Sequence, residues 1–355
     1  MPKRRKFYHR LVFNTLENLE QIVGRLQRET NAITDNPVLR HFSLPKCREI
    51  DERAKTERHI RERRATCLAN LRNCNIDYSS FYKNAFDAYN EIVVFDLLHG
   101  KGLVWFQDPG TIPSPDYIWI NQSGDAINID LKTLSYNHDN SNFKDIQQQS
   151  LRSKISIEEQ QAKKKPVAMG EPVFYSPFKK GENLDHYKVS TVIGSFIDKI
   201  QNNYKPSQLN FGGRDGILLI DTIILGHPIF MQEALPVYIY PHLNQLKSGC
   251  LWNACFGKEN DPMYDWVEFE GKPNIGEPLK KNGIMIGNQG PSAIVFITYR
   301  GNETNLVGLH LSDLQSEQIG VSMNEICKFV NDELNSMYFN IQLSPVFELT
   351  LPPII

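Results

Sequence analysis

The sequence contains few cysteines and no long apolar run. Its six cysteines are irregularly spaced, include no Cys-x-x-Cys pair and have no partnering histidine cluster, so they signal neither a disulfide framework nor a zinc site. No segment approaches the roughly eighteen consecutive apolar residues of a membrane span. The basic start at residues 3–6 leads into polar residues and not into the apolar core of a signal peptide. These absences predict a cytoplasmic protein that does not enter a membrane.

Neither sign of charge dominates the chain of 355 residues, whose formal net charge is -2. The distribution is nevertheless uneven. Residues 1–72 hold 17 Lys and Arg against 9 Asp and Glu, a net charge of +8, and the remainder carries -10. A basic front segment joined to an acidic body fits a polyanionic partner and a carboxylate-rich metal site. The alternative is that amphipathic helices in the front segment simply have charged outer faces.

The hydrophobic pattern predicts an α/β (α+β) protein. Helices are expected over 11–30, 48–73, 78–98, 192–204 and 323–338. Strands are expected over 103–106, 116–120, 126–134, 216–225, 291–299, 306–311 and 346–351. The polar stretch 136–170 is expected to contain one helical piece and includes the lysine run 163–165. That run is either a solvated surface segment or a contact to backbone phosphates.

Two of the expected strands form a β-hairpin that carries three charged residues. Asp116 opens the first strand, and a turn at 122–125 leads into the second strand, where Asp130 and Lys132 lie two residues apart. Alternate residues of a strand share a face, so antiparallel pairing would bring Asp116 beside Asp130 and Lys132. Carboxylates and the Leu131 carbonyl are oxygen ligands of the kind that Mg²⁺ takes, and a neighbouring lysine offsets phosphate charge.

An acid-x-Lys triplet alone is a weak motif, and Glu270-Gly271-Lys272 is a second one in this chain. Context separates the two triplets. Asp130-Leu131-Lys132 closes an apolar strand and has Pro115-Asp116 upstream on the strand expected to pair with it. An inward-facing charged pair in such a strand is costly unless it serves a site. The alternative interpretation is a cross-strand ion pair on a solvated sheet face, with Asp116 as a turn carboxylate.

With these residues the sequence resembles the PD-(D/E)xK nuclease superfamily, and within it type II restriction endonucleases. The matching segments are 114–119, Ser-Pro-Asp-Tyr-Ile-Trp, and 128–133, Asn-Ile-Asp-Leu-Lys-Thr. Upstream, Glu91 is similar to the helix glutamate that assists metal binding in many members; otherwise it is a surface acid of its helix. The resemblance covers roughly residues 80–226. The sequence departs from the family in two ways. It has Asp130 where Glu is frequent, and it lacks a correctly spaced Gln-x-x-x-Tyr motif after the hairpin.

The resemblance implies a restriction-endonuclease-like mixed β-sheet core flanked by helices at 77–226. A basic helical subdomain at 1–76 would grip DNA or dimerise, and an α+β extension at 227–355 would complete the core and read DNA. The implied activity is Mg²⁺-dependent hydrolysis of duplex DNA at a specific sequence, with Mn²⁺ able to substitute. Asp116, Asp130, Leu131 and Glu91 would bind the metal, and Lys132 would act with the three acids in catalysis.

A symmetric homodimer would supply one active site for each strand of a palindromic duplex. Two other functions stay open. One is a less sequence-specific DNase of the same fold, acting in defence or repair. The other is a non-catalytic DNA-binding protein in which the hairpin charges are structural. Cleavage into discrete fragments would distinguish a restriction endonuclease from the less specific DNase. Absence of cleavage would favour the non-catalytic DNA-binding protein.

Overall fold

A computed structural model divides the chain into two compact units, residues 1–97 with 135–181 and residues 98–134 with 182–355. The structure describes residues 17–33, 38–73, 79–106, 114–134, 152–153, 155–170, 188–225, 231–240, 245–267, 273–287, 290–300, 303–311 and 316–332. The three functional sections expected from the sequence, 1–76, 77–226 and 227–355, stay predictions. The boundaries of the compact units differ from those of the expected sections, because the second unit contains residues on both sides of 135–181.

The first unit is helical. It contains α1 (Leu19–Ile33), α2 (Leu44–Arg53), α3 (Arg58–Asn73), most of α4 (Ser79–Leu98) and a short helix within 155–162. The expected helix over 78–98 is confirmed by α4, and the spacing that predicts an amphipathic α1 places Leu19, Ile22 and Leu26 in the core.

The single helix expected over 48–73 is wrong, since the chain forms two helices, α2 and α3, separated at 54–57. The carbonyls at the end of α2 lack partners within the helix. Arg61 of α3 donates to the Ala54 carbonyl at 2.8 Å and to the Lys55 carbonyl at 2.9 Å. These long-side-chain contacts stabilise a break that helix periodicity does not reveal.

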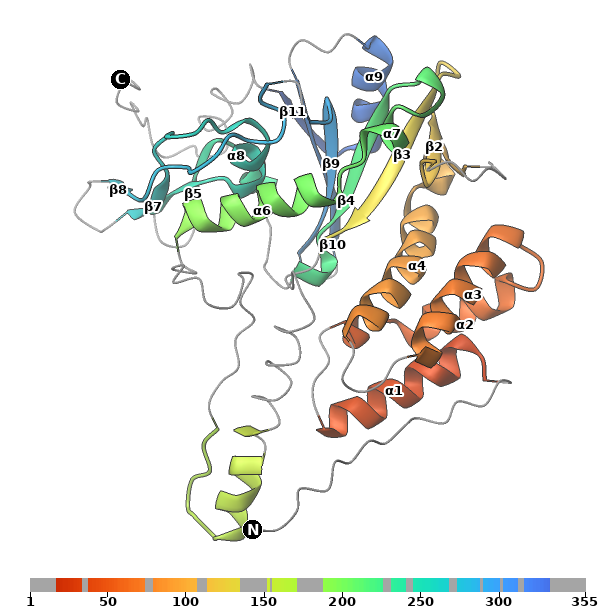
Figure 1. Cartoon of the computed structure of the whole chain (residues 1–355), viewed down its shortest axis with the longest axis vertical. Helices are drawn as coiled ribbons and strands as arrows, with labels where there is room; N and C mark the ends of the chain where they lie inside the picture. Colours follow the sequence, from red (N-terminus) through yellow and green to blue (C-terminus); the bar gives the residue numbers. More distant parts are fainter. Residues whose placement is uncertain are drawn as a thin grey trace. The chain divides into compact units, whose positions relative to one another are not determined.

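The second unit is built on a seven-stranded mixed sheet in the order β1-β2-β3-β4-β9-β10-β11 (Figure 1). Its strands are β1 (Leu103–Trp105), β2 (Tyr117–Ile120), β3 (Ala126–Thr133), β4 (Gly216–Asp221), β9 (Ala293–Arg300), β10 (Glu303–His310) and β11 (Phe329–Asp332). The pairs β1–β2, β2–β3 and β9–β10 are antiparallel, whereas β3–β4, β4–β9 and β10–β11 are parallel. The expected mixed sheet with flanking helices is therefore present.

Helices and two small sheets accompany this sheet. The helices are α6 (Val189–Asn203), α7 (Pro206–Leu209), α8 (Cys250–Phe256) and α9 (Glu317–Ile326). The two-stranded sheets are β5 (Val237–Tyr240) with β6 (Gln245–Ser248), and β7 (Tyr264–Val267) with β8 (Pro273–Ile275). Helix α6 packs against α8, α7 contacts β3 and β4, and α9 contacts β3 (Figure 1).

Strand β4 lies in the core, and all six of its residues are buried. It ends at Asp221, four residues before the end of the strand expected over 216–225. The Asp221 carboxylate accepts a hydrogen bond from the Ile223 N–H at 2.8 Å. This local side-chain bond turns the chain into the 3-10 helix η4 (Ile223–Leu225) in place of further strand.

The helix expected over 323–338 is wrong, because α9 ends at Ile326 and the chain then forms β11. Residues Val307–His310 of β10 pair in parallel with β11, and this pairing outweighs local helix propensity. The strands expected over 291–299 and 306–311 are confirmed by β9 and β10. The strand expected over 346–351 and the triplet Glu270-Gly271-Lys272 lie outside the described residues.

In the part of the chain that the structure describes, no helix combines the length and the apolarity that crossing a membrane requires. Cys47, Cys67, Cys250 and Cys255 are buried, and Cys327 is half-buried. Cys74 lies outside the described ranges.

Candidate active site

The β2–β3 hairpin, residues 116–133, brings Asp116 opposite Asp130. Tyr117 pairs with Ile129 in the antiparallel register, so the next pair outward joins Asp116 and Asp130. The Leu131 N–H donates to Asp116 Oδ2 at 2.9 Å, which anchors the Asp116 side chain to β3. The Asp116 carboxylate lies near enough to Asp130 to raise the pKa of that carboxyl. The juxtaposition expected from the sequence is thus present.

Asp130 and Lys132 project from the same face of β3 and form an ion pair. Lys132 Nζ lies 2.8 Å from Asp130 Oδ1. Asp130 is fully buried, whereas the Lys132 side chain is 18% exposed. Their partners on β4 are Leu218 and Ile220, which offer no polar atom from their side chains. The charged pair therefore belongs to the sheet interior and not to the solvated sheet face of the alternative interpretation.

This environment disfavours the charged form of Asp130. Burial raises the pKa of Asp130 to about 7, the nearby Asp116 carboxylate adds to the increase, and Lys132 opposes it. A pKa perturbed by desolvation and by a specific charged neighbour is typical of functional sites. It also means that a cation bound at Asp130 would replace a proton near neutral pH.

The second carboxylate oxygen of Asp130 lies in the interior. Asp130 Oδ2 is buried and, among the described residues, makes no hydrogen bond. Such an atom is expensive in an interior unless an ion or a water completes its coordination. Asp116 and Asp130 thus fit a hard divalent cation by chemistry. In the described part of the chain, however, no cluster of three or more His, Cys, Asp or Glu side chains surrounds a possible metal position.

The Leu131 carbonyl is the remaining oxygen ligand that the sequence predicts. The Asn128 N–H donates to the main-chain carbonyl of Asp215, just before β4, and the Leu134 N–H donates to that of Asp221, at the end of β4. The even-numbered residues of β3 therefore direct their main-chain groups toward β4. By alternation, Leu131 directs its N–H and its carbonyl toward the β2 side. Strand β2 begins only at Tyr117. A cation beside Asp116 and Asp130 would therefore have to draw its remaining ligands from this carbonyl and from solvent.

Glu91 does not share a compact unit with the other predicted ligands. It lies on α4 in the first unit, whereas Asp116, Asp130 and Lys132 belong to the second. Arg63 Nε of α3 lies 2.5 Å from Glu91 Oε2. The carboxylate thus already has a cationic partner within its own unit, and its predicted metal role stays untested.

The hairpin turn is held by contacts that the sequence does not predict. The Asp125 N–H donates to Asn121 Oδ1 at 2.8 Å, and Gly124 has φ 85°, a conformation that favours glycine. Glu325 of α9 accepts from Trp119 Nε1 and from the Gln122 N–H, both at 3.0 Å. Helix α9 therefore fixes the hairpin end at which the two strands reverse (Figure 1).

Sequence reasoning also missed Asn128 and Gln208. Asn128 is fully buried two residues before Asp130, and its Nδ2 donates to the carbonyls of Leu209 at 3.0 Å and Phe211 at 2.9 Å. Gln208 Nε2 donates to the Ser114 carbonyl at 2.9 Å. The available signal was a polar Asn128 between two apolar residues, Ile127 and Ile129.

Comparison with known proteins found no matching family model, no matching curated protein and no matching solved structure.

Proposed function

We propose that this protein is a Mg²⁺-dependent endonuclease that hydrolyses phosphodiester bonds in duplex DNA, with the β2–β3 hairpin as its active site. The observation that carries the proposal is the pairing of Asp116 with a fully buried Asp130, one of whose oxygens has no hydrogen bond among the described residues. Lys132 Nζ lies 2.8 Å from the other oxygen. Acids and a lysine in this order on two paired strands support the resemblance to PD-(D/E)xK nucleases.

Asp116, Asp130 and the Leu131 carbonyl would hold the cation. When bound, Mg²⁺ supplies Lewis-acid stabilisation of the charge that develops on the attacked phosphate. The Leu131 N–H holds Asp116 Oδ2 in place, and Asp116 Oδ1 would be the ligand atom. Lys132 contributes a positive charge beside the phosphate and can orient the attacking water. Mn²⁺ accepts the same oxygen ligands and would substitute for Mg²⁺.

The finer fold and specificity belong to the same proposal. A restriction-endonuclease-like core is supported by the antiparallel β2–β3 pair followed by α6 and by β4 parallel to β3. Cleavage at a specific sequence, as in type II restriction endonucleases, rests on the sequence resemblance. It would require residues in 227–355 to read bases and a homodimer to cut both strands. Glu91 would act as an additional metal ligand only if its carboxylate left its ion pair with Arg63.

The decisive experiment incubates the purified protein with several fully sequenced duplex DNAs and Mg²⁺, and resolves the products on a gel. EDTA and the Asp130→Ala variant are expected to abolish cleavage. Glu270→Ala is the matched control, because it removes the acid of the second acid-x-Lys triplet. We expect Glu270→Ala to cleave like the wild type. Cleavage that survives Asp130→Ala would refute the hairpin as the active site.

The pattern of products separates the remaining functions. Discrete bands that map to one sequence would support a restriction endonuclease. A metal-dependent smear would favour a less sequence-specific DNase of the same fold. Intact DNA with Mg²⁺ and with Mn²⁺, together with retained binding of duplex, would favour a non-catalytic DNA-binding protein.

A further inference from the structure

The chain segment that contains α7 and the 3-10 helix η3 (Phe211–Gly213) lies against the base of the candidate active site. We call residues 206–213 the bracket. It contacts β3 at the level of Asn128, on the face that also carries Asp130, because the two residues are two apart on one strand. Nothing in the local sequence of the bracket resembles a catalytic motif, yet its contacts reach the strand of Asp130 and the segment that leads into Asp116.

The first contact runs to β3. Asn128 Nδ2 donates to the Leu209 and Phe211 carbonyls at 3.0 and 2.9 Å, so one buried amide holds two consecutive turns of the bracket. Gly216 allows this close approach, because a Cβ at that position would lie 2.3 Å from the Leu209 carbonyl oxygen. The bracket is therefore fixed to β3 and to the start of β4 by packing that tolerates little displacement.

The second contact runs to the segment that precedes β2. Gln208 Nε2 donates to the Ser114 carbonyl at 2.9 Å. Only Pro115 separates Ser114 from Asp116, and the proline ring removes one of the backbone torsions through which Asp116 could move relative to Ser114. A fixed Ser114 carbonyl therefore restricts Asp116.

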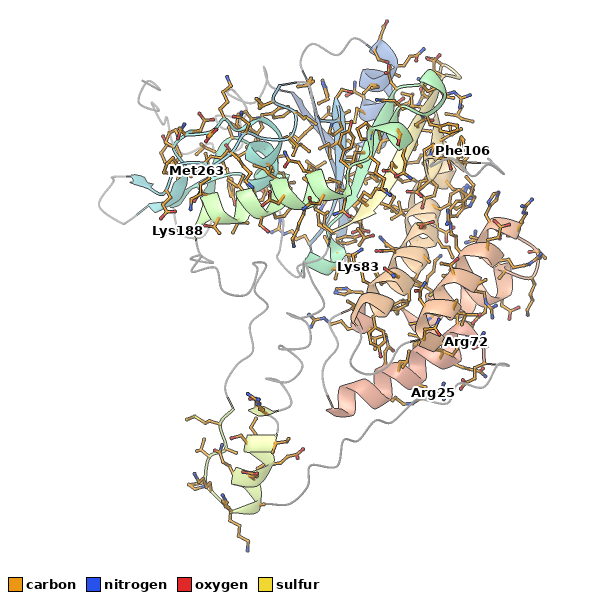
Figure 2. The ribbon with its side chains drawn as sticks, viewed as in Figure 1. Arg25, Arg72, Lys83, Phe106, Lys188 and Met263 are labelled. Carbon is orange, nitrogen blue, oxygen red and sulfur yellow. The ribbon has the colours of Figure 1, made fainter. Side chains whose placement is uncertain are left out.

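A third contact reaches Asp116 from β1. The Phe106 N–H donates to the Asp116 carbonyl at 3.3 Å, and the Phe106 ring packs edge-on against Phe211 with centroids 5.2 Å apart. Phe106, labelled in Figure 2, directly follows β1. The bracket thus contacts the neighbours of Asp116 at Ser114 and at Phe106, while Asn128 ties it to the strand of Asp130.

We infer that Gln208 and Asn128 are positioning residues that set the separation of Asp116 and Asp130 through the bracket. The inference rests on the proposed function, in which that separation decides whether one cation can bind both carboxylates. Neither residue would be a ligand of the cation. A metal site needs such supporting contacts because its ligands must be held close to the productive geometry.

The test replaces Gln208 with Met, which keeps the length of the side chain and removes the donor. Gln27→Met is the matched control, since Gln27 Nε2 also donates to main-chain carbonyls, those of Leu39 and Phe42, within the helical unit. In the metal-free full-length protein, hydrogen exchange of the Leu131 amide reports on Asp116, because that N–H donates to Asp116 Oδ2.

We expect Gln208→Met to speed exchange at Leu131 about tenfold, the effect of one hydrogen bond of ordinary strength, and Gln27→Met to leave it unchanged. Exchange at Asn128, whose N–H donates to Asp215, checks that β3 itself stays paired. Unchanged exchange at Leu131 in Gln208→Met would overturn the inference. If the Met variant does not fold, Gln208→Glu repeats the measurement with a side chain of the same shape that donates no hydrogen bond.

A cleavage assay gives the second readout. Gln208→Met is expected to raise the Mg²⁺ concentration for half-maximal cleavage about tenfold while the KM for DNA stays as in the wild type, because the variant alters metal geometry and not the DNA surface. A wild-type midpoint in this variant would also overturn the inference. If the wild type itself does not cleave, the proposed function fails, and the exchange measurement still decides whether the bracket positions Asp116.

Discussion

Asp130 accepts a hydrogen bond from Lys132 at 2.8 Å through Oδ1, while its Oδ2 is buried without a hydrogen bond in the described structure. A cation-carboxylate pair that served stability alone would be expected to satisfy both oxygens. The nearby Asp116 carboxylate adds electrostatic repulsion to the charged form of Asp130. The pair therefore costs stability in the absence of a ligand, which is the usual condition of a binding site.

The first prediction concerns pH and the metal-free protein. The pKa of Asp130 is raised to about 7 by burial and by Asp116, whereas an unfolded Asp titrates near about 3.9. Below about pH 4 both states bind the proton. Between about pH 4 and about pH 7 only the folded state holds it, so the stability of the folded state falls as the pH rises, by at most about 1.4 kcal/mol per pH unit, and the loss is complete above the folded pKa. Asp130→Asn removes this loss.

Urea unfolding in EDTA at about pH 5 and about pH 8 checks the prediction. We expect Asp130→Asn to be more stable than the wild type at the higher pH, and to lose the stabilisation that added Mg²⁺ gives the wild type. Asp198→Asn is the control, because the Asp198 side chain is 48% exposed and pairs with Lys281. The prediction is contradicted if the wild type becomes more stable relative to Asp130→Asn as the pH rises, because the expected change in unfolding free energy has the opposite sign.

The second prediction concerns Lys132. If it stabilises charge at the attacked phosphate, Lys132→Met should slow cleavage about 10²- to 10³-fold under single-turnover conditions. Binding of duplex DNA in Ca²⁺ should change little, because one cation contributes little to total phosphate contact. Lys132→Arg should recover part of the rate, since it keeps the charge but not the shape.

Lys188→Met is the matched control for Lys132, because Lys188 is another partly exposed lysine with a carboxylate partner, Glu277, at 2.5 Å. Its side chain is labelled in Figure 2 at the start of α6. Full cleavage by Lys132→Met would assign Lys132 to the structural alternative.

The third prediction separates the two interpretations of the lysine run. Lys163, Lys164 and Lys165 are exposed and make no ion pair within the described residues. If these lysines contact phosphates, changing all three to Ala reduces the salt dependence of DNA binding. The magnitude of the slope of log binding constant against log salt concentration is then expected to fall by about 2 to 3. Fluorescence anisotropy across a salt series in Ca²⁺ measures the slope.

The control for the lysine run changes Lys55, Lys83 and Lys281 to Ala. It alters net charge equally, but these lysines are each paired with a carboxylate, namely Glu52, Asp87 and Asp198. An equal slope in the two triple variants would identify the run at 163–165 as a solvated surface segment.

The fourth prediction concerns a buried charge network beside α8. Glu233 is 2% exposed and accepts from Lys247 Nζ at 3.0 Å, from the Tyr238 hydroxyl at 2.6 Å and from the Cys250 N–H at 2.7 Å. Glu233→Ala should cost about 3 to 5 kcal/mol of unfolding free energy, because it leaves Lys247 buried without its carboxylate. Urea denaturation measures the change.

The double variant Glu233→Leu with Lys247→Met provides the comparison for that network. It removes both charges and should cost less than Glu233→Ala alone. A double variant that is less stable than the single variant would mean that the network contributes net stability in addition to avoiding an unpaired charge.

Several features of the fold could be predicted from local pattern. The alternation of Ile127, Ile129 and Leu131 predicts β3, and the polar turn at 122–125 predicts a hairpin whose register opposes Asp116 and Asp130. These are short-range features, since a period of two and a tight turn determine which side chains share a face.

Contacts between distant segments could not be predicted. Asn128 and Leu209 are 81 positions apart, and Gln208 and Ser114 are 94 apart, so no periodicity links them. The same holds for β11, where pairing with β10 outweighed the local pattern that predicted a helix over 323–338. Side-chain hydrogen bonds and sheet edges depend on which segments meet, and that is a property of the packed chain.

The sequence by itself determined that two acids and a lysine share one face of a hairpin, because strand geometry requires it. Only the tertiary structure decided that Asp130 is fully buried and that its pKa rises, because both effects depend on which distant segments of the chain pack around β3. Desolvation is a consequence of long-range packing, and the chemical character of the site arises from that burial.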